Sequence, residues 1–158
     1  MNLFYLDSSP KIVAQYHTNS HCVKMILETA QLLSTAHQFL DGYNPNLYKA
    51  THVNHPVCKW VRESVSNYRW TYELFVELCK EYEYRYGKIH KTFSNMGHLL
   101  KEVPINIIEI GFTKPALAMP DEFKCSDPIL SYRQYYIGAK QHLAKWKNRE
   151  TPTWYIVR

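Results

Sequence analysis

The chain has 158 residues, of which 46% are hydrophobic and 15% aromatic, and its formal net charge is +5 at pH 7. This length is enough to bury a core without disulfides or a metal, and we expect one domain over residues 1–158. No apolar run reaches the roughly 18 residues of a membrane span, and the N-terminal residues do not form a signal peptide. These totals exclude a membrane protein and favour a cytoplasmic one. A moderate positive charge permits a nucleic-acid partner but does not require one.

Capping and turn residues divide the first part of the chain into a short helix and a long one. The sequence SSP at residues 8–10 is typical of a helix start and predicts a short helix over residues 10–17. The sequence TNS at residues 18–20 breaks this helix and caps the next, which runs to Phe39. The turn-forming residues 41–46, DGYNPN, end the long helix.

The long helix has two different faces. At 100° per residue, one face carries Val23, Ile26, Leu27, Ala30, Leu33, Ser34 and His37. The opposite face carries a polar stripe of His21, Lys24, Glu28 and Gln31, with His17 in line if the helix extends that far back. Spacings of three and four residues place these side chains one above another, so that an amine and a carboxylate can act on one substrate.

The second half of the chain predicts further helices around an irregular segment. A long helical region begins with Asn54 as its cap and runs to Tyr86, with a kink or break at residues 64–67. A third helix spans residues 94–102, and a final one runs from residue 127 to Trp146. Residues 103–120 are rich in Ile and Pro and predict extended, irregular chain, in which a small strand would pair with the N-terminus. The expected fold class is mainly α.

The pair Lys24 and Glu28 is the first candidate for chemistry. A lysine beside a carboxylate is suited to forming a Schiff base with a sugar aldehyde carbon, while the carboxylate handles protons, and His21 lies in the same stripe. The alternative is an ordinary solvated ion pair on an amphipathic helix, because such pairs are common and weak.

The start of the second long helical region is the next candidate. His52, Asn54 and His55 place polar groups at a helix N-terminus, where phosphate binds readily, and Arg62 adds a cation. Trp60 is a candidate for stacking on a base, although a tryptophan in such a helix is more often core. His52, His55 and Cys58 match no recognised zinc spacing, and the four cysteines contain no CxxC, so we expect no metal site and no disulfide framework.

The C-terminal residues alternate basic and aromatic side chains. Lys145, Lys147 and Arg149 stand among Trp146, Trp154 and Tyr155. This pattern suits a nucleic-acid edge, and it equally suits a C-terminus that is anchored by its aromatic residues.

Several stretches together resemble a family of small proteins from tailed phages of the T-even type. They are YHTNSHCVKMILETAQLLSTAH, YKATHVNHPVCKWVRESVSNYRW, EYRYGKIHK, AMPDEFK and YRQYYIGAKQHLAKWKNRETPTWY, and they cover most of the chain. This resemblance implies a phage protein in the host cytoplasm but no particular activity.

A second resemblance does imply an activity. KMILETAQLL is similar to the KQ-x-x-E-x-x-Q-I-L segment of the pyrimidine-dimer DNA glycosylase family, and NHPVCKW resembles that family's N/H-P-x-x-x-W element. The matching residues are Lys24, Glu28 and Gln31 in the first motif and His55, Pro56 and Trp60 in the second. The resemblance implies a compact, mostly α fold and base-excision chemistry on DNA, with an amine nucleophile, a catalytic glutamate and no cofactor.

The chain departs from this family at the expected nucleophile. The best-studied members use the α-amine that is exposed when Met1 is removed, but Asn2 is a poor residue for that removal. Lys24 is therefore the substitute candidate, and the α-amine of Met1 is the other. The family's basic pair before the first motif is replaced by Ser20 and His21, and Met25 stands where the family has Gln.

Three functions follow from these patterns. The first is a phage DNA glycosylase and abasic-site lyase that acts on damaged or modified pyrimidines, with phosphates held by His55, Arg62 and the cations of the tail. The second is a non-catalytic module that binds nucleic acid or a nucleotide. The third is a phage factor that binds a host protein.

Overall fold

The computed structural model describes residues 1–158, and all of its regular secondary structure is helical. The mainly α fold class predicted from the sequence is confirmed. There are six α-helices and two short 3-10 helices: α1 (Pro10–Tyr16), α2 (Asn19–Asp41), α3 (Pro56–Glu63), α4 (Val65–Tyr86), α5 (Lys91–Leu100), η1 (Asp121–Phe123), α6 (Pro128–Ala139) and η2 (Gln141–Leu143).

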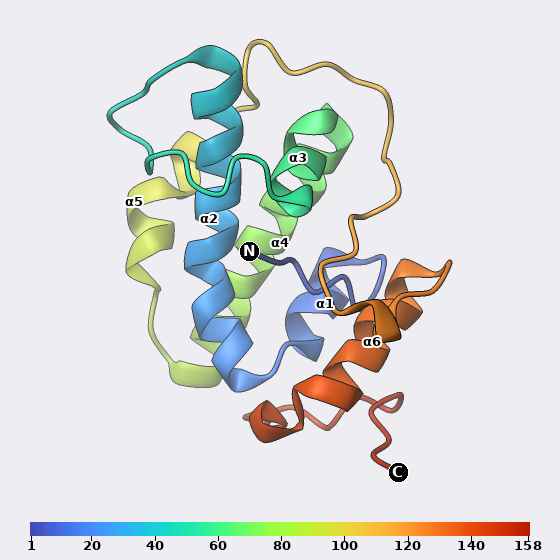
Figure 1. The fold of residues 1–158 in the computed structure, drawn as a ribbon. Helices are drawn as coiled ribbons and strands as arrows, with labels where there is room; N and C mark the ends of the chain where they lie inside the picture. The colour runs from blue at the N-terminus through green and yellow to red at the C-terminus, as the bar shows by residue number, and fades with distance from the viewer.

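The two long helices α2 and α4 form the centre of the molecule (Figure 1). Helix α1 packs on α4, while α3 and α5 pack on both long helices. The N-terminal residues enter this assembly beside α2, and the chain after α5 crosses the molecule as a long strap before it reaches α6 (Figure 1). The core lies between α2 and α4 and includes Met25, Ile26, Leu33, Leu74, Phe75 and Leu78.

Local capping explains where most helices begin. Ser9 caps α1 and Thr18 caps α2, and both lie within the SSP and TNS segments that indicated these helix starts. Asn54 was the wrong cap for α3, because the ring of His55 accepts the N–H of Val57 instead. Proline at the following position supports that start, since its missing N–H needs no partner there.

The predicted break in the second helical region lies at Ser64, and there α3 ends and α4 begins. The hydroxyl of Ser64 donates to Glu109 at 2.6 Å and accepts the N–H of Ile110 at 3.1 Å. These bonds also explain why the predicted small strand is wrong. The backbone of this part of the strap hydrogen-bonds to the side chains of Ser64 and Asn67 and to the N–H of Val65 at the start of α4, so that no partner strand is needed.

Two helix ends differ from the prediction. Helix α5 spans Lys91–Leu100, three residues earlier than expected at its start, because His90 caps it. Helix α6 stops at Ala139 and not at Trp146. The chain continues as the 3-10 turn η2 and then folds back toward α1 and α2, where Trp146 donates its ring N–H to the carbonyl of Tyr16.

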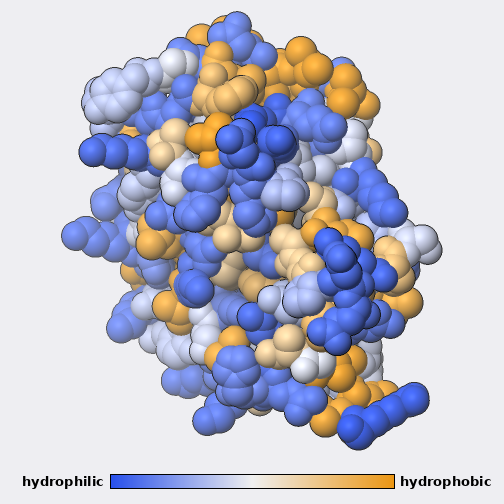
Figure 2. Space-filling view, viewed as in Figure 1, coloured by the Kyte–Doolittle hydropathy of each residue, from blue (hydrophilic) through white to orange (hydrophobic).

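The two faces of α2 are less distinct than the pattern indicated. Val23 and Leu27, from the apolar face, are 38% and 41% exposed, whereas His21, from the polar stripe, is only 5% exposed. The reason is that α2 is covered on several sides, by α4, α3, α5, the N-terminal residues and α6. Hydrophilic side chains cover much of the face in Figure 2, and hydrophobic ones gather at its upper edge, where the strap exposes Ile105, Ile108 and Ile110.

Candidate active site

A cavity of about 420 Å³ lies where the N-terminal residues meet the first half of α2. The segment before α3, the strap and the end of α6 complete its wall. The lining residues are Met1, Asn2, Phe4, His21, Lys24, Met25, Glu28, His55, Leu117, Ala118, Met119, Tyr135 and Lys140. The structure therefore brings His21, Lys24, Glu28, His55 and Met1 together. Their catalytic roles stay predictions.

The cavity places one carboxylate between two amines. Glu28 Oε1 lies 3.7 Å from the α-amine nitrogen of Met1, and Glu28 Oε2 lies 3.9 Å from Lys24 Nζ. The side chains of Met1 and Glu28 are 4% and 16% exposed, whereas that of Lys24 is 74% exposed. An exposed i, i+4 pair alone would be an ordinary surface ion pair. What distinguishes this site is the third member, the α-amine beside the sheltered carboxylate.

Asn2 holds the N-terminus in this position. Its side-chain oxygen accepts the N–H groups of Leu3 at 2.8 Å and Phe4 at 3.1 Å, while its amide nitrogen donates to the carbonyl of Ala118 at 2.9 Å. Phe4 has φ +51°, which is uncommon for a residue other than glycine and indicates a backbone held by its surroundings. The first four residues are thus fixed at both their backbone and their side chains.

His21 forms part of the cavity wall. Its ring stacks on Phe4 with 4.1 Å between centroids, and its Nδ1 lies 2.6 Å from the hydroxyl of Tyr136. Burial is the main cause that lowers the pKa of His21 to about 3, and nearby cationic groups add to it. The ring is therefore neutral at physiological pH, and its contacts suit a residue that supports Phe4 and the N-terminus.

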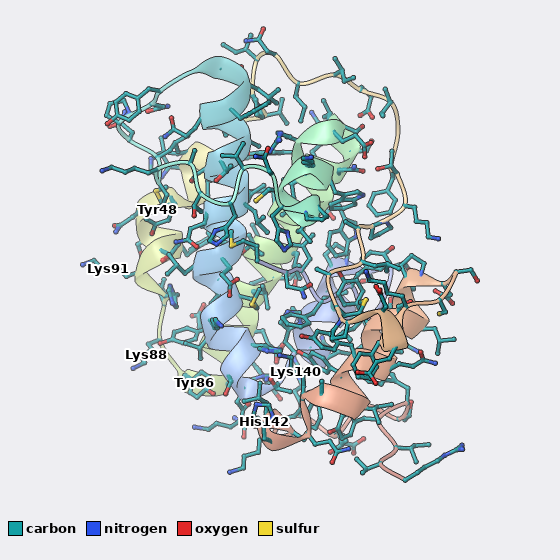
Figure 3. All side chains as sticks on the ribbon, viewed as in Figure 1. Tyr48, Tyr86, Lys88, Lys91, Lys140 and His142 are labelled. Carbon is teal, nitrogen blue, oxygen red and sulfur yellow. The ribbon has the colours of Figure 1, made fainter.

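Positive charge predominates around the cavity. The α-amine of Met1, Lys24 and Lys140 face a single carboxylate, that of Glu28. Lys140, labelled in Figure 3, directly follows α6 and lines the same cavity as Met1. A concave site with this charge balance attracts an anionic substrate such as a DNA backbone.

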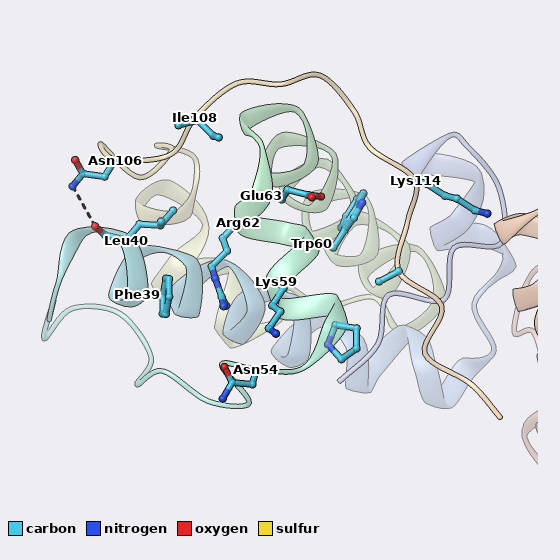
Figure 4. A pocket seen from close by; sticks show the side chains of 12 residues that line it. Phe39, Leu40, Asn54, Lys59, Trp60, Arg62, Glu63, Asn106, Ile108 and Lys114 are labelled. Carbon is cyan, nitrogen blue, oxygen red and sulfur yellow. Dashed lines mark hydrogen bonds between the residues drawn. The ribbon is translucent and has the colours of Figure 1, made fainter. Parts of the chain in front are cut away.

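The second predicted constellation divides between two cavities. Asn54, Trp60 and Arg62 line a larger one, of about 750 Å³, between the end of α2, α3 and the strap (Figure 4). Trp60 is largely buried and donates its ring N–H to Thr113, as expected of a core tryptophan. Arg62 donates to the carbonyl of Val53 and stacks its guanidinium on Phe39 at 4.0 Å. No ion pair between an amine and a carboxylate, such as those that Glu28 makes with Met1 and Lys24, is found in this larger cavity.

Two other predicted substrate-binding residues line neither cavity. Gln31 continues the stripe of α2 beyond Glu28 and is half-buried. His52 is exposed, and its ring Nδ1 lies 2.8 Å from the hydroxyl of Thr51.

The basic tail residues contact the N-terminal end of α2 and the C-terminal part of α4, and none lines the cavity. The N–H of Lys147 donates to the side chain of Asn19, and Lys147 Nζ lies 5.1 Å from the ring centroid of Tyr86. Arg149 donates to both oxygens of Glu81. The carbonyl of Lys145 accepts the N–H of Asn19. These contacts hold the basic part of the tail against α2 and α4.

Three parts of the site were not predicted: the clamp formed by Asn2, the strap residues 117–119, and Tyr135 with Lys140 from α6. Helical periodicity carries no signal for them, because each reaches the site through contacts between distant parts of the chain. The one local signal was the basic end of α6, which includes Lys140.

No group of three or more His, Cys, Asp or Glu side chains is arranged to hold a metal ion, and all four cysteines are free thiols. None of the helices combines the length and the apolar character that a membrane crossing requires.

Comparison with known proteins gives one match. The family described as pyrimidine dimer DNA glycosylase matches residues 1–95, more than half of the chain. The matched region contains Met1, Glu28 and His55 and ends within α5. No curated protein and no solved structure matches the chain.

Proposed function

Because the chain belongs to the pyrimidine dimer DNA glycosylase family, we propose that it is a DNA glycosylase and abasic-site lyase for damaged or modified pyrimidines. The observation that carries the proposal is the α-amine of Met1, which lies 3.7 Å from the sheltered carboxylate of Glu28 in a basic cavity. In this proposal the α-amine is the nucleophile and Glu28 is the acid–base group.

The reaction follows from these two groups. The lone pair of the α-amine attacks C1′ of the target nucleotide, and the electron pair of the C1′–N1 bond leaves with the base. Glu28 takes the proton that the attacking amine loses and stabilises the positive charge that develops at C1′. Glu28 returns this proton to O4′ as the C1′–O4′ bond breaks, which opens the sugar ring and leaves a Schiff base between the amine and C1′. Removal of a proton from C2′ then expels the 3′-phosphate, so that the strand is cleaved.

Conformational restriction favours Met1 over Lys24 as the nucleophile. Both nitrogens are within 4 Å of Glu28, but Lys24 is mostly exposed and must give up the freedom and the hydration of a long side chain to attack. The α-amine is already fixed by Asn2. In this arrangement Lys24 and Lys140 serve at the mouth of the cavity, where they hold DNA phosphates.

The proposal names DNA as the partner, and the target base must leave the helical stack to reach the cavity. A phage origin, a location in the host cytoplasm and a host protein partner stay predictions from the sequence.

Borohydride trapping tests the proposal. The purified protein is incubated with DNA that carries a pyrimidine dimer, a modified pyrimidine or an abasic site, and the Schiff base is reduced to a stable adduct. We expect one adduct per protein, located by peptide mass spectrometry on the N-terminal peptide. Glu28→Gln reduces the trapping rate by at least about 100-fold, because the acid–base group is lost.

Two variants serve as controls. Glu77→Gln alters a partly buried carboxylate outside the cavity, which pairs with Lys80 at 3.3 Å on α4, and leaves the trapping rate unchanged. Lys24→Ala still gives the adduct if Met1 is the nucleophile, whereas an adduct on the Lys24 peptide assigns the reaction to Lys24. The absence of an adduct with every substrate, together with salt-dependent DNA binding that Glu28→Gln retains, would instead favour the non-catalytic module.

A further inference from the structure

His55 has one ring nitrogen engaged in structure and the other free. Its Nδ1 accepts the N–H of Val57 at 3.1 Å and thereby caps α3. Its Nε2 makes no hydrogen bond within the protein, and the ring lines the cavity that holds Met1 and Glu28.

The cap determines where the imidazole proton resides. A nitrogen that accepts an N–H must present its lone pair, so Nδ1 is unprotonated. In a neutral imidazole the proton is then on Nε2, and this nitrogen is a hydrogen-bond donor. Protonation of Nδ1 would convert the cap acceptor into a donor that faces the N–H of Val57. The helix start therefore opposes the charged form of His55.

The surroundings favour the same neutral form. Burial lowers the pKa of His55, and the nearby N-terminal ammonium and His52 lower it further. A neutral single donor is poorly suited to hold a phosphate, which was the role expected from the sequence. It is suited to a neutral oxygen that gains negative charge during the reaction.

We infer that His55 is a catalytic residue that donates a hydrogen bond from Nε2 to the O2 carbonyl of the departing pyrimidine. This inference rests on the proposed function. When the C1′–N1 bond breaks, its electron pair moves onto the base and is shared between N1 and its adjacent carbonyl oxygen, O2. His55 keeps its proton and stabilises that charge, and the base later takes a proton from water.

The choice of O2 follows from the geometry of a pyrimidine. O2 is bonded to the carbon next to N1, so it lies close to C1′, whereas O4 is on the far side of the ring. A donor that shares a cavity with the nucleophile therefore reaches O2 when the amine reaches C1′. Every pyrimidine carries O2, and the contact thus selects the base class and not a particular substituent.

His55→Asn tests the inference, because asparagine is a strong N-cap and has no donor at the position of Nε2. His90 offers a matched control. It caps α5 in the same way, with its Nδ1 accepting the N–H of Thr92 at 3.1 Å, but it does not line the cavity. Thermal unfolding of both variants checks that the caps persist, and His55→Ser, a second capping residue, replaces His55→Asn if that variant fails to fold.

Two substrates separate the steps. On DNA with the damaged or modified pyrimidine, we expect His55→Asn to lower the single-turnover rate of base release by about 100-fold, as for loss of one oxyanion donor. On DNA with a preformed abasic site no base leaves, and the cleavage rate is unchanged. The defect on base release becomes smaller when an electron-withdrawing 5-substituent stabilises the departing base. His90→Asn matches the wild type on both substrates.

Other results would overturn the inference in distinguishable ways. Equal rates for His55→Asn and wild type on both substrates would remove the role of His55 and leave the proposed function intact. An equal loss on both substrates, seen as a raised KM, would assign His55 to phosphate binding. A wild-type protein that neither releases a base nor cleaves an abasic site would refute the proposed function and the inference together.

Discussion

At the scale of single residues, the site depends on how an otherwise mobile chain terminus is held. Chain termini are usually poorly ordered unless they are tied down. Here one asparagine side chain makes three hydrogen bonds, two to its own segment and one to the strap at Ala118. Asn2 is therefore a positioning residue, which acts on the reaction through the α-amine of Met1.

Asn2→Leu keeps the approximate size of the side chain and removes all three hydrogen bonds. We expect the single-turnover trapping rate to fall by about 10- to 100-fold, because a small misplacement of a reacting group has a large effect on rate. KM changes little, since DNA binding depends on cations at the cavity mouth. Leucine also disfavours removal of Met1, which intact-mass measurement verifies.

Asn95→Leu, on an exposed position of α5, is the matched control and retains the wild-type rate. A trapping rate for Asn2→Leu equal to that of wild type would show that the α-amine needs no clamp, or that Lys24 is the nucleophile.

At the scale of helices, a buried arginine joins α4 to the junction between α1 and α2. Arg85 is fully buried in its side chain and donates to Glu81 at 3.1 Å. It also donates to the carbonyls of His17 and Gln15 and to the side chain of Asn19. This junction leads directly into the turn of α2 that carries His21, so Arg85 fixes the direction in which α2 starts.

Arg85→Met leaves these acceptors without a partner in the interior. We expect the free energy of unfolding to fall by about 3 kcal/mol, as when one member of a buried ionic network is removed. Urea unfolding followed by circular dichroism measures the change. Arg149→Met removes the more exposed partner of the same Glu81 and costs less, about 1 kcal/mol. Similar losses for the two variants would contradict the central role assigned to Arg85.

The starts of α1 and α2 could be predicted from the sequence because their causes are local. A capping side chain determines them, as at Ser9 and Thr18, and a proline at the next position supports the start after Ser9. The end of α6 could not be predicted in this way. Residues after Ala139 retain a helical pattern, and they leave the helix because Trp146 finds its partner on Tyr16, 130 positions earlier in the chain.

At the scale of the whole molecule, the same distinction explains the site. The spacing of Lys24 and Glu28 predicted their pairing, since both lie on one helix. It could not predict the α-amine, Lys140 or the strap, because three distant segments must fold onto α2 before the cavity exists. The helical spacing also could not predict the burial of His21, because the side chains that cover its ring, Phe4 and Tyr136, belong to other parts of the chain.

Burial of histidines between these segments makes the stability of the fold depend on pH. His17 is fully buried, with its Nδ1 donating to the carbonyl of Val13 at 2.8 Å and its Nε2 without a partner. Burial lowers the pKa of His17 to about 4 and that of His21 to about 3, from 6.5 in both cases. Between pH 6.5 and pH 4 the unfolded chain therefore binds protons that the folded chain excludes.

We expect the free energy of unfolding to be highest above pH 6.5 and to fall as the pH is lowered toward 4. Each histidine contributes a slope of up to about 1.4 kcal/mol per pH unit, because the unfolded state holds the extra proton. Urea unfolding at a series of pH values between 7.5 and 4.5 measures this slope. His17→Gln reduces the slope by up to about 1.4 kcal/mol per pH unit, because one proton fewer is taken up on unfolding. His98→Gln, at an exposed position of α5, keeps the wild-type slope. A wild-type stability that stays constant over this range would show that neither histidine is held neutral by the packing of the N-terminus, α2 and α6.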